Sequence, residues 1–181
     1  MGTIRTPHPV KLFVGMLAGN IELFEIAQTE LASRFGTIDA ASEIMPFDFT
    51  DYYTDEMGPN LLRKFVGFSR SINPKELASI KLFTNDLEES ISEQLGSERR
   101  LVNLDPGYIS LSKLVLASTK DYSHRIYLSD GIFAEVTLHY SHHCFNPWPW
   151  TYPDYKTDAY CRFFESLRNQ HLEALRKSGT M

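Results

Sequence analysis

VKLFVGML, residues 10–17, is an apolar run interrupted by only one lysine and one glycine. A run of this length is typical of a strand that is buried on both faces of a sheet. Asn20 then supplies an N-cap, and apolar residues recur at helical spacing up to Gly36, a residue type that commonly ends helices. The stretch therefore predicts a buried strand followed by an amphipathic helix.

The following segments continue this alternation of strand and helix. Residues 38–49 and 62–68 have the apolar content of strands. Asn73-Pro74-Lys75-Glu76 combines a cap, a proline in the first turn and a capping-box glutamate, and it predicts a helix that continues to Gly96. Residues 100–104 are interpreted as a further short strand.

The second half of the chain predicts a short apolar helix at residues 111–119 and a β-hairpin with strands at 125–128 and 132–140. Apolar and polar residues alternate in the second hairpin strand, so we expect it to bury one face. Residues 144–155 contain too many prolines for sheet or helix, and Thr157 caps a final helix.

The order of these elements predicts an α+β fold, in the form of an α/β sandwich. Strand, helix, strand, strand, helix and strand over residues 10–104 match the ferredoxin-like split βαβ core. The helix at 111–119, the β-hairpin and the C-terminal helix are then appended to that core. A chain of 181 residues with 43% hydrophobic residues is long enough for one core, so we expect residues 1–181 to form a single domain.

Composition limits the classes of partner. The formal charge of -5 argues against general nucleic-acid binding, which normally requires a basic face. No apolar run approaches the roughly 20 residues of a membrane span, and the N-terminal residues lack the pattern of a signal peptide. The two cysteines have no paired spacing. We expect a cytoplasmic protein without membrane contact, and the oligomeric state stays open.

The chain resembles the bacterial domain of unknown function 4416 family in six stretches that follow the family's order: VKLFVGM (10–16), PFDFTDYY (46–53), NLDPGY (103–108), TKDY (119–122), AEVTL (134–138) and WTYPDY (150–155). Members are often labelled GTP-binding proteins, and the resemblance implies GTP as a ligand.

The residues themselves contain no GTP-binding motif. Residues 15–20 join the first strand to the first helix as a phosphate-binding loop would, but they lack its lysine and its serine or threonine. In Thr119-Lys120-Asp121 the aspartate comes one position too early for a guanine-reading TKxD motif. The glycines at 15 and 19 are better explained by the turn.

Asp48, Asp51 and Tyr53 lie in a polar segment after a predicted strand. Carboxylate oxygens at this density suit magnesium, with a substrate phosphate completing its coordination. On this hypothesis the two aspartates are catalytic and Tyr53 contacts the ligand. The alternative is a solvated turn, in which Asp48 is a cap and the aromatic side chains pack beneath it.

Asn103, Asp105 and Tyr108 surround Pro106-Gly107, which predicts a turn beyond the short strand. This turn would project Asp105 as a catalytic carboxylate, with Asn103 and Tyr108 binding the ligand. The alternative is an Asx turn, in which Asp105 only accepts a hydrogen bond from the backbone.

Lys113, Lys120, His124 and Arg125 concentrate positive charge in an otherwise acidic chain, along and just beyond the predicted helix at 111–119. We interpret the lysines and the arginine as ligand-binding residues. His124 is a candidate general acid or base, because the pKa of histidine ordinarily lies near neutrality. The alternative is that these cations interact with the C-terminal end of the helix.

Two further groups of side chains contain residue types that bind metals or stack on rings. His139, His142, His143 and Cys144 have no second cluster at metal-ligand spacing, so we predict no metal site there. Trp148, Trp150, Tyr152 and Tyr155 fit two explanations: they stack on a base or sugar, or they clamp the proline-rich connector onto the core.

The functional hypothesis is that the three polar segments converge on one cleft that binds a phosphorylated or nucleotide-like small molecule. Magnesium-assisted phosphoryl or nucleotidyl transfer would suit these side chains. The alternative is a non-catalytic binding or assembly protein, in which the same charges pair with one another. The residues do not decide whether the protein is an enzyme.

Overall fold

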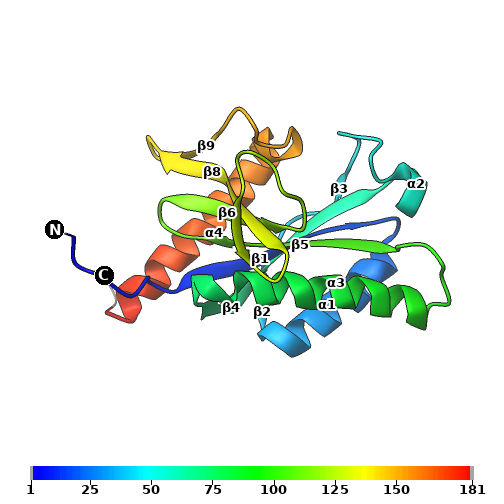
Figure 1. Cartoon of the computed structure of the whole chain (residues 1–181), viewed down its shortest axis with the longest axis horizontal. Coiled ribbons are helices and arrows are strands. Elements are labelled where there is room, and N and C mark those ends of the chain that lie inside the picture. Colours follow the sequence, from blue (N-terminus) through cyan, green and yellow to red (C-terminus); the bar gives the residue numbers. More distant parts are fainter. Residues whose placement is uncertain (1, 180–181) are drawn as a thin grey trace.

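The computed structural model describes residues 2–179, which build one open antiparallel sheet of nine strands and four α-helices (Figure 1). The sheet order is β2-β4-β1-β5-β6-β8-β7, with β3 paired to β4 and β9 paired to β8. The strands are β1 (Val10–Ala18), β2 (Ile38–Ala41), β3 (Met45–Pro46), β4 (Leu62–Ile72), β5 (Val102–Ile109), β6 (Lys113–Ser118), β7 (Ile126–Ser129), β8 (Ile132–Ser141) and β9 (Cys144–Pro147).

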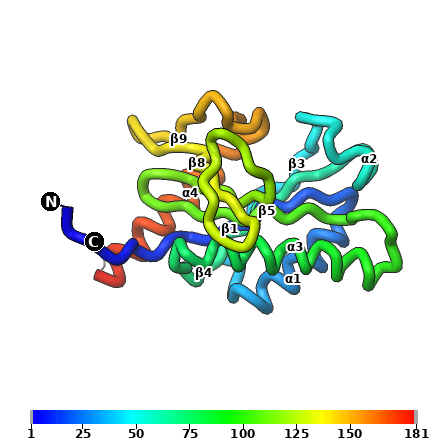
Figure 2. The backbone as a smooth tube through the Cα atoms, in the orientation of Figure 1, coloured from blue at the N-terminus to red at the C-terminus, as the bar shows by residue number. Residues whose placement is uncertain are grey.

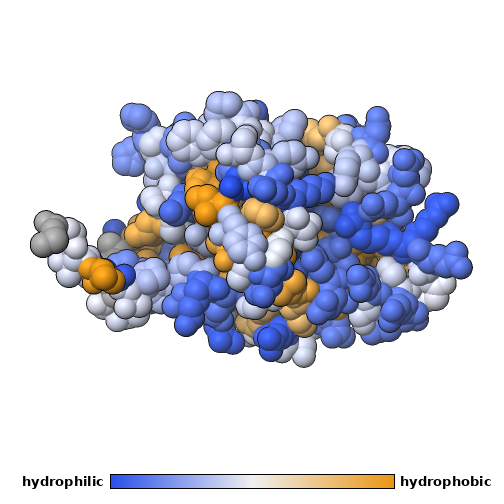
Figure 3. Space-filling model, viewed as in Figure 1, coloured by the Kyte–Doolittle hydropathy of each residue, from blue (hydrophilic) through white to orange (hydrophobic). Residues whose placement is uncertain are grey.

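The helices cover both faces of this sheet. Helices α1 (Ile21–Phe35) and α3 (Leu77–Gln94) pack against one face, and α4 (Asp158–Lys177) packs against the other. Helix α2 (Thr54–Met57) is a single turn between β3 and β4. The N-terminal residues lie at the same end of the molecule as the C-terminal end of α4 (Figure 2). None of the helices in residues 2–179 is long and apolar enough to span a bilayer, and hydrophilic side chains predominate on the face in Figure 3.

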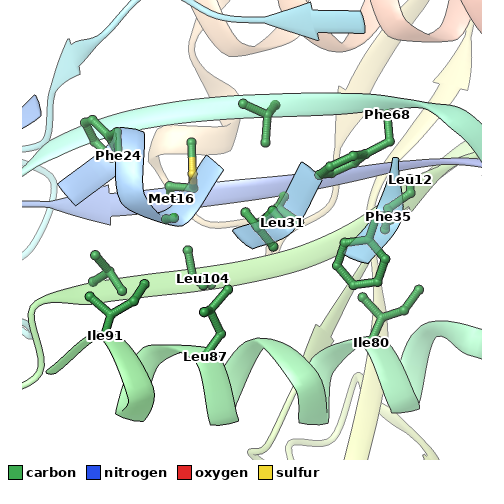
Figure 4. Packing of buried hydrophobic residues seen from close by; sticks show 14 of the residues in the cluster. Leu12, Met16, Phe24, Leu31, Phe35, Phe68, Ile80, Leu87, Ile91 and Leu104 are labelled. Atoms are coloured by element: carbon green, nitrogen blue, oxygen red, sulfur yellow. The ribbon is translucent and has the colours of Figure 1, made fainter. Parts of the chain in front are cut away.

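Strand β1 lies at the centre of two cores, as its continuous apolar sequence predicts. Leu12 and Met16 face α1 and α3, where they pack with Leu87 and Leu104 (Figure 4). Phe13, on the opposite face, packs against α4. Every residue of β1 is buried, which confirms the prediction of a strand covered on both sides.

The predicted helix caps are present. Asn20 accepts a hydrogen bond from the backbone N–H of Leu23, and Gly36, with φ of 93°, ends α1. Asn73 and Glu76 form the reciprocal capping box, which opens a 3₁₀ turn (η1, Pro74–Glu76) that leads into α3. These contacts satisfy backbone donors that have no partner in a first helical turn.

The mixed α/β class is confirmed, and two other expectations about the fold stay predictions. The ferredoxin-like description of residues 10–104 is one, and the single-domain organisation is the other. The predicted strand at 38–49 is instead two short strands, β2 and β3, both of which pair with β4. Residues 144–155 are not free of regular structure either, because β9 pairs with β8 and a 3₁₀ turn (η2, Asp154–Lys156) precedes α4.

The predicted helix at residues 111–119 is wrong, because these residues contain strand β6. The segment has only one apolar run, Leu114–Ala117, and short apolar runs fit a buried strand as well as a helix. Pairing with both β5 and β8 decides between the two. Lys120, His124 and Arg125 therefore follow a strand rather than a helix.

The predicted turn at Pro106-Gly107 is also wrong, because both residues lie inside β5. Pro106 faces Val14 of β1 one position before the pairing of β5 with β6 begins at Gly107. A proline is tolerated at such a place because its missing N–H interrupts little of the ladder. A Cβ on Gly107 would lie 2.5 Å from the carbonyl oxygen of Val115 and 2.6 Å from the Phe13 ring. Because glycine has no Cβ, these atoms can approach the backbone of β5 closely.

The expectation that β8 buries only one face is wrong as well. Glu135 and Thr137 belong to the face predicted to be polar and exposed, yet both are buried. The segment between β9 and α4 covers them, because the Thr151 hydroxyl donates a hydrogen bond to the backbone carbonyl of Thr137.

Candidate functional site

A cleft of about 1180 Å³ opens on the α4 side of the sheet. Phe65 and Arg63 share one face of β4 because they are two positions apart. Phe65 is covered by α4, whereas Arg63 lies beyond the N-terminal end of that helix and lines the cleft. The lining residues come from the sheet, from α3 and from four further segments, 47–56, 98–100, 119–125 and 150–155. The exposed ones include Glu89 and Glu93 of α3 and the neighbouring Glu98 and Arg99.

Arg63 is a deeply buried charge in the cleft lining, with 3% of its surface exposed. Its Nη2 donates to Asp154 Oδ2 at 3.1 Å, and its Nη1 lies 3.7 Å from Asp105 Oδ2. Its Nε and Nη1 are buried and have no hydrogen-bond partner among residues 2–179. Burial raises the pKa of Asp154, although the neighbouring Arg63 opposes the shift. Two nitrogens of the guanidinium are therefore buried without a hydrogen bond.

Asp105 lies next to Arg63 and is the least buried of these carboxylates, with 26% of its side chain exposed. Asn103 Nδ2 donates to Asp105 Oδ2 at 2.6 Å, and Lys81 Nζ lies 3.7 Å from Oδ1. Gly15 of β1 stands opposite Asp105 in the sheet. Because Gly15 has no side chain, the Arg63 guanidinium can pack above the backbone of Gly15. Asp105 thus accepts one hydrogen bond, from Asn103, and has two cations nearby, while part of it faces solvent.

Lys81 and Glu88 of α3 complete the edge of β5 where β6 turns away from it. The two strands pair over only three residue pairs, so Leu104 has no strand partner on that side. Lys81 Nζ donates to the carbonyl of Leu104 at 2.8 Å, and the N–H of Leu104 donates to Glu88 Oε1 at 2.6 Å. The two side chains satisfy backbone groups that would otherwise be buried without partners. Burial raises the pKa of Glu88 to about 7.

Glu135 is the centre of a second buried cluster. Its carboxylate accepts hydrogen bonds from Arg125 Nε at 2.9 Å and from Thr137 Oγ1 at 3.0 Å, and His124 Nε2 lies at 3.2 Å. The remaining Arg125 donors contact Ser118 Oγ, the backbone oxygen of Lys120 and the Tyr152 hydroxyl. Burial, together with the charge of Glu135, raises the pKa of Tyr152 to about 12. Each nitrogen of the Arg125 guanidinium therefore has a hydrogen-bond partner.

Two bridges join the segments that form the rim. Lys120 Nζ donates to the Tyr52 hydroxyl at 2.7 Å and lies 4.0 Å from the centre of its ring. Arg100 contacts Glu56 at 2.9 Å and Glu88 at 3.3 Å, so it links α2 to α3. Lys120 is exposed and has no carboxylate partner among the described residues.

A column of stacked rings forms one side of the cleft and extends behind it. The rings follow one another in space in the order Tyr122, His124, Trp150 and Trp148. The centroids of successive rings are 6.0, 5.5 and 5.3 Å apart, and the ring planes lie within 16° of parallel. His139 packs on the far side of Trp148 at 4.4 Å. Trp150 is held in place because its indole N–H donates to the backbone oxygen of Val136.

A comparison with protein families identifies one match over most of the chain. The family described as "Domain of unknown function (DUF4416)" matches residues 8–171. The chain belongs to this family. No curated protein and no solved structure matches it. Membership therefore confirms the resemblance carried by the sequence stretches, and the DUF4416 cleft has to be interpreted from its own geometry.

The DUF4416 cleft brings together six of the ten residues that the sequence singled out, namely Tyr53, Asn103, Asp105, Lys120, His124 and Arg125. The other four do not line it. Asp48 and Asp51 point to solvent beside the cleft segment 49–53, Tyr108 packs between α3 and β6 on the other face of the sheet, and Lys113 is exposed at the opposite end of β6.

Several cleft residues were missed by the sequence interpretation, above all Arg63, Lys81, Glu88, Glu135 and Asp154. Three of them, Arg63, Lys81 and Glu88, carry a signal that could have been noticed, since they are charges inside patterns that predict burial. Arg63 interrupts the apolar run of β4, and Lys81 and Glu88 share a helical stripe with Leu77, Thr84 and Ile91. A charge at such a position is costly unless it is paired.

A preformed metal site is not apparent in the described part of the chain. No three side chains among its histidines, cysteines, aspartates and glutamates are arranged to hold a metal ion. Asp105 is partly exposed in the cleft, and a magnesium ion bound to it would share it with oxygen atoms of a ligand.

Proposed function

We propose that the cleft binds a small anionic molecule of the phosphorylated or nucleotide-like kind. The observation that supports this most is Arg63, a buried positive charge that lines the cleft and whose Nε and Nη1 have no hydrogen-bond partner among the described residues. Planar guanidinium groups suit phosphate and carboxylate oxygens because they donate two parallel hydrogen bonds.

The concentration of buried charge supports the same proposal. Taking an ion out of water costs several kcal/mol, and apolar residues often stabilise a fold as well as a buried ion pair does. Here Arg63, Lys81, Glu88, Glu135 and Asp154 are all buried, and all line one cleft. Clusters of this kind in a concave site are typical of binding and catalytic centres.

Lys120 is the proposed contact for the anionic group. It is exposed on the rim, and the neutral Tyr52 hydroxyl is the only hydrogen-bond partner of its ammonium group among the described residues. An incoming phosphate would replace that hydroxyl and gain a charge-assisted hydrogen bond. Asp105, on the floor, is placed to accept a proton from a ligand hydroxyl or to share a magnesium ion with the phosphate, as metal-assisted phosphoryl or nucleotidyl transfer requires.

A non-catalytic binding or assembly role is the second candidate, and one observation favours it. Most charges in the cleft already have partners of opposite sign, as in Arg63 with Asp154, Arg125 with Glu135, and Arg100 with Glu56 and Glu88. Such pairs can serve to hold loops together without any ligand.

A thermal-shift comparison separates the two candidates. The wild-type chain is heated with inorganic phosphate, sugar phosphates and nucleotides, with and without magnesium. A ligand at about 100 times its Kd stabilises the folded state by about 2.7 kcal/mol, which should raise Tm by about 5–10 °C. We expect Lys120→Gln and Asp105→Asn to reduce the affinity of that ligand about tenfold, the effect of losing one charge-assisted contact.

The matched controls are Lys113→Gln and Asp51→Asn, which make the same chemical changes outside the cleft lining. They should leave the shift as it is in the wild type. If no compound raises Tm, the non-catalytic candidate replaces the proposal, and if all four variants respond alike, the ligand binds elsewhere.

A further inference from the structure

The exposed aromatic side chains of the described chain are concentrated in the cleft. Six have more than a third of their surface exposed, and five of them line it: Phe49, Tyr52, Tyr122, Trp150 and Tyr152, with Tyr127 of β7 as the exception. Most of the rest of the visible surface is hydrophilic (Figure 3). Clustered exposed aromatic rings mark a binding surface because their exposure to water is unfavourable.

The ring column holds two of these side chains in fixed orientations. Tyr122 and Trp150 lie on either side of His124, with interplanar angles of 6° and 16°. His124 is oriented by Glu135, and Trp150 is fixed by the backbone of Val136. A partner therefore meets rings that are already aligned and loses little entropy in ordering them.

Tyr122 is the ring at the open end of this column. It is 55% exposed, although the Arg125 guanidinium carbon lies 4.8 Å from the centre of its ring, while Trp148 at the other end of the column is covered by His139. Lys120, the proposed anion contact, is two residues before Tyr122 on the same segment. A ligand that combines an anionic group with a flat ring would thus find both partners next to each other.

We propose that the ligand carries a planar aromatic ring, as a nucleoside monophosphate does, and that this ring stacks on Tyr122 while the phosphate contacts Lys120. This inference rests on the proposed function and narrows it, since a phosphate or a sugar phosphate alone would leave the aromatic rim unused. The cleft volume of about 1180 Å³ is ample for a nucleotide, because ligand sites commonly occupy about 300–1000 Å³.

Calorimetric titration of the full chain with ribose 5-phosphate and with the 5′-monophosphates of adenosine, guanosine, cytidine and uridine tests the inference. Stacking of a base on an aromatic side chain contributes about 1–3 kcal/mol, so at least one nucleotide should bind about tenfold or more tightly than ribose 5-phosphate. Tyr122→Leu should remove most of that preference and leave the affinity for ribose 5-phosphate unchanged. Tyr127→Leu, which alters an exposed tyrosine outside the cleft, should change neither value.

The outcomes separate the two proposals. If ribose 5-phosphate binds as tightly as every nucleotide, or if Tyr122→Leu keeps the full preference, the planar-ring inference is overturned while the anion site stands. If none of the five compounds binds, both proposals fail. Circular dichroism of the Tyr122→Leu chain checks that a lost preference does not come from a lost fold.

Discussion

Glu88 reaches into the gap between β5 and β6, and its environment has consequences for stability. Its carboxyl group accepts the Leu104 N–H and lies beside Arg100, yet burial outweighs these favourable contacts and raises its pKa to about 7. The ordinary value in an unfolded chain is 4.5. The folded chain therefore binds more protons than the unfolded chain between these two pH values.

The sign of the pH effect follows from this difference. Because the folded state holds the extra proton, the free energy of unfolding decreases as pH rises from about 4.5 to about 7, by about 3 kcal/mol from this residue. Glu88→Gln removes the titration, so the difference in stability between the variant and the wild type should change by that amount across the window. Urea unfolding at a series of pH values measures it.

Glu89→Gln is the control, because Glu89 is the exposed neighbour of Glu88 on the same helix. Its stability should follow that of the wild type at every pH. A constant difference between Glu88→Gln and the wild type from pH 4.5 to 8 would show that Glu88 does not titrate in this range.

Individual residues also mark the limit of what the sequence can predict. The caps Asn20 and Asn73 were predictable because a cap depends on contacts three residues away. Arg63 was not singled out, because its partners Asp105 and Asp154 are 42 and 91 positions further along the chain. Its burial depends on which strands become neighbours.

At the scale of elements, β5 and β6 account for the largest errors of the sequence interpretation. Pro106-Gly107 has the composition of a turn, and Leu114–Ala117 is too short for its periodicity to distinguish helix from strand. Both assignments are decided by partners, since β5 pairs with β1 over its whole length and β6 lies between β5 and β8. The long segments β1, α1 and α3 were predictable because their patterns extend over many residues.

A substitution at Gly107 tests how closely β5 packs against the Val115 oxygen and the Phe13 ring. In Gly107→Ala the new Cβ would meet the Val115 oxygen and the Phe13 ring at less than 3 Å, so the strands or the ring must move. Overpacking of this kind costs about 1–3 kcal/mol of stability. Urea unfolding should show that loss, whereas Gly19→Ala, where nothing lies within 4 Å, should change stability by less than about 0.5 kcal/mol. Equal stabilities for the two variants would contradict the packing described for β5.

At the scale of the whole molecule, the cleft arises from two features of the sheet. Strands β5 and β6 diverge after three residue pairs. Helix α4 covers Phe65 but does not extend over the neighbouring Arg63, which lines the cleft. Side chains from β4, β5, β6, β8 and α3, together with residues 47–56, 98–100, 119–125 and 150–155, then converge on the space that is left. The sequence correctly placed residues 48–53 after a strand, whereas Asn103 and Asp105 lie inside β5 and residues 120–125 follow a strand that was predicted to be a helix. The meeting of these residues depends on the sheet order and could not be read from spacing.

The most direct test of ligand binding at the cleft is to find where on the protein a ligand binds. The ¹⁵N-labelled chain is titrated with the tightest-binding compound of the phosphate panel, and amide chemical shifts are followed by NMR. The account predicts that the largest changes occur in residues 50–53, 103–105 and 118–125, which are far apart in sequence and meet at the cleft. Changes clustered on the α1 and α3 face of the sheet, or none with any compound of the panel, would contradict it.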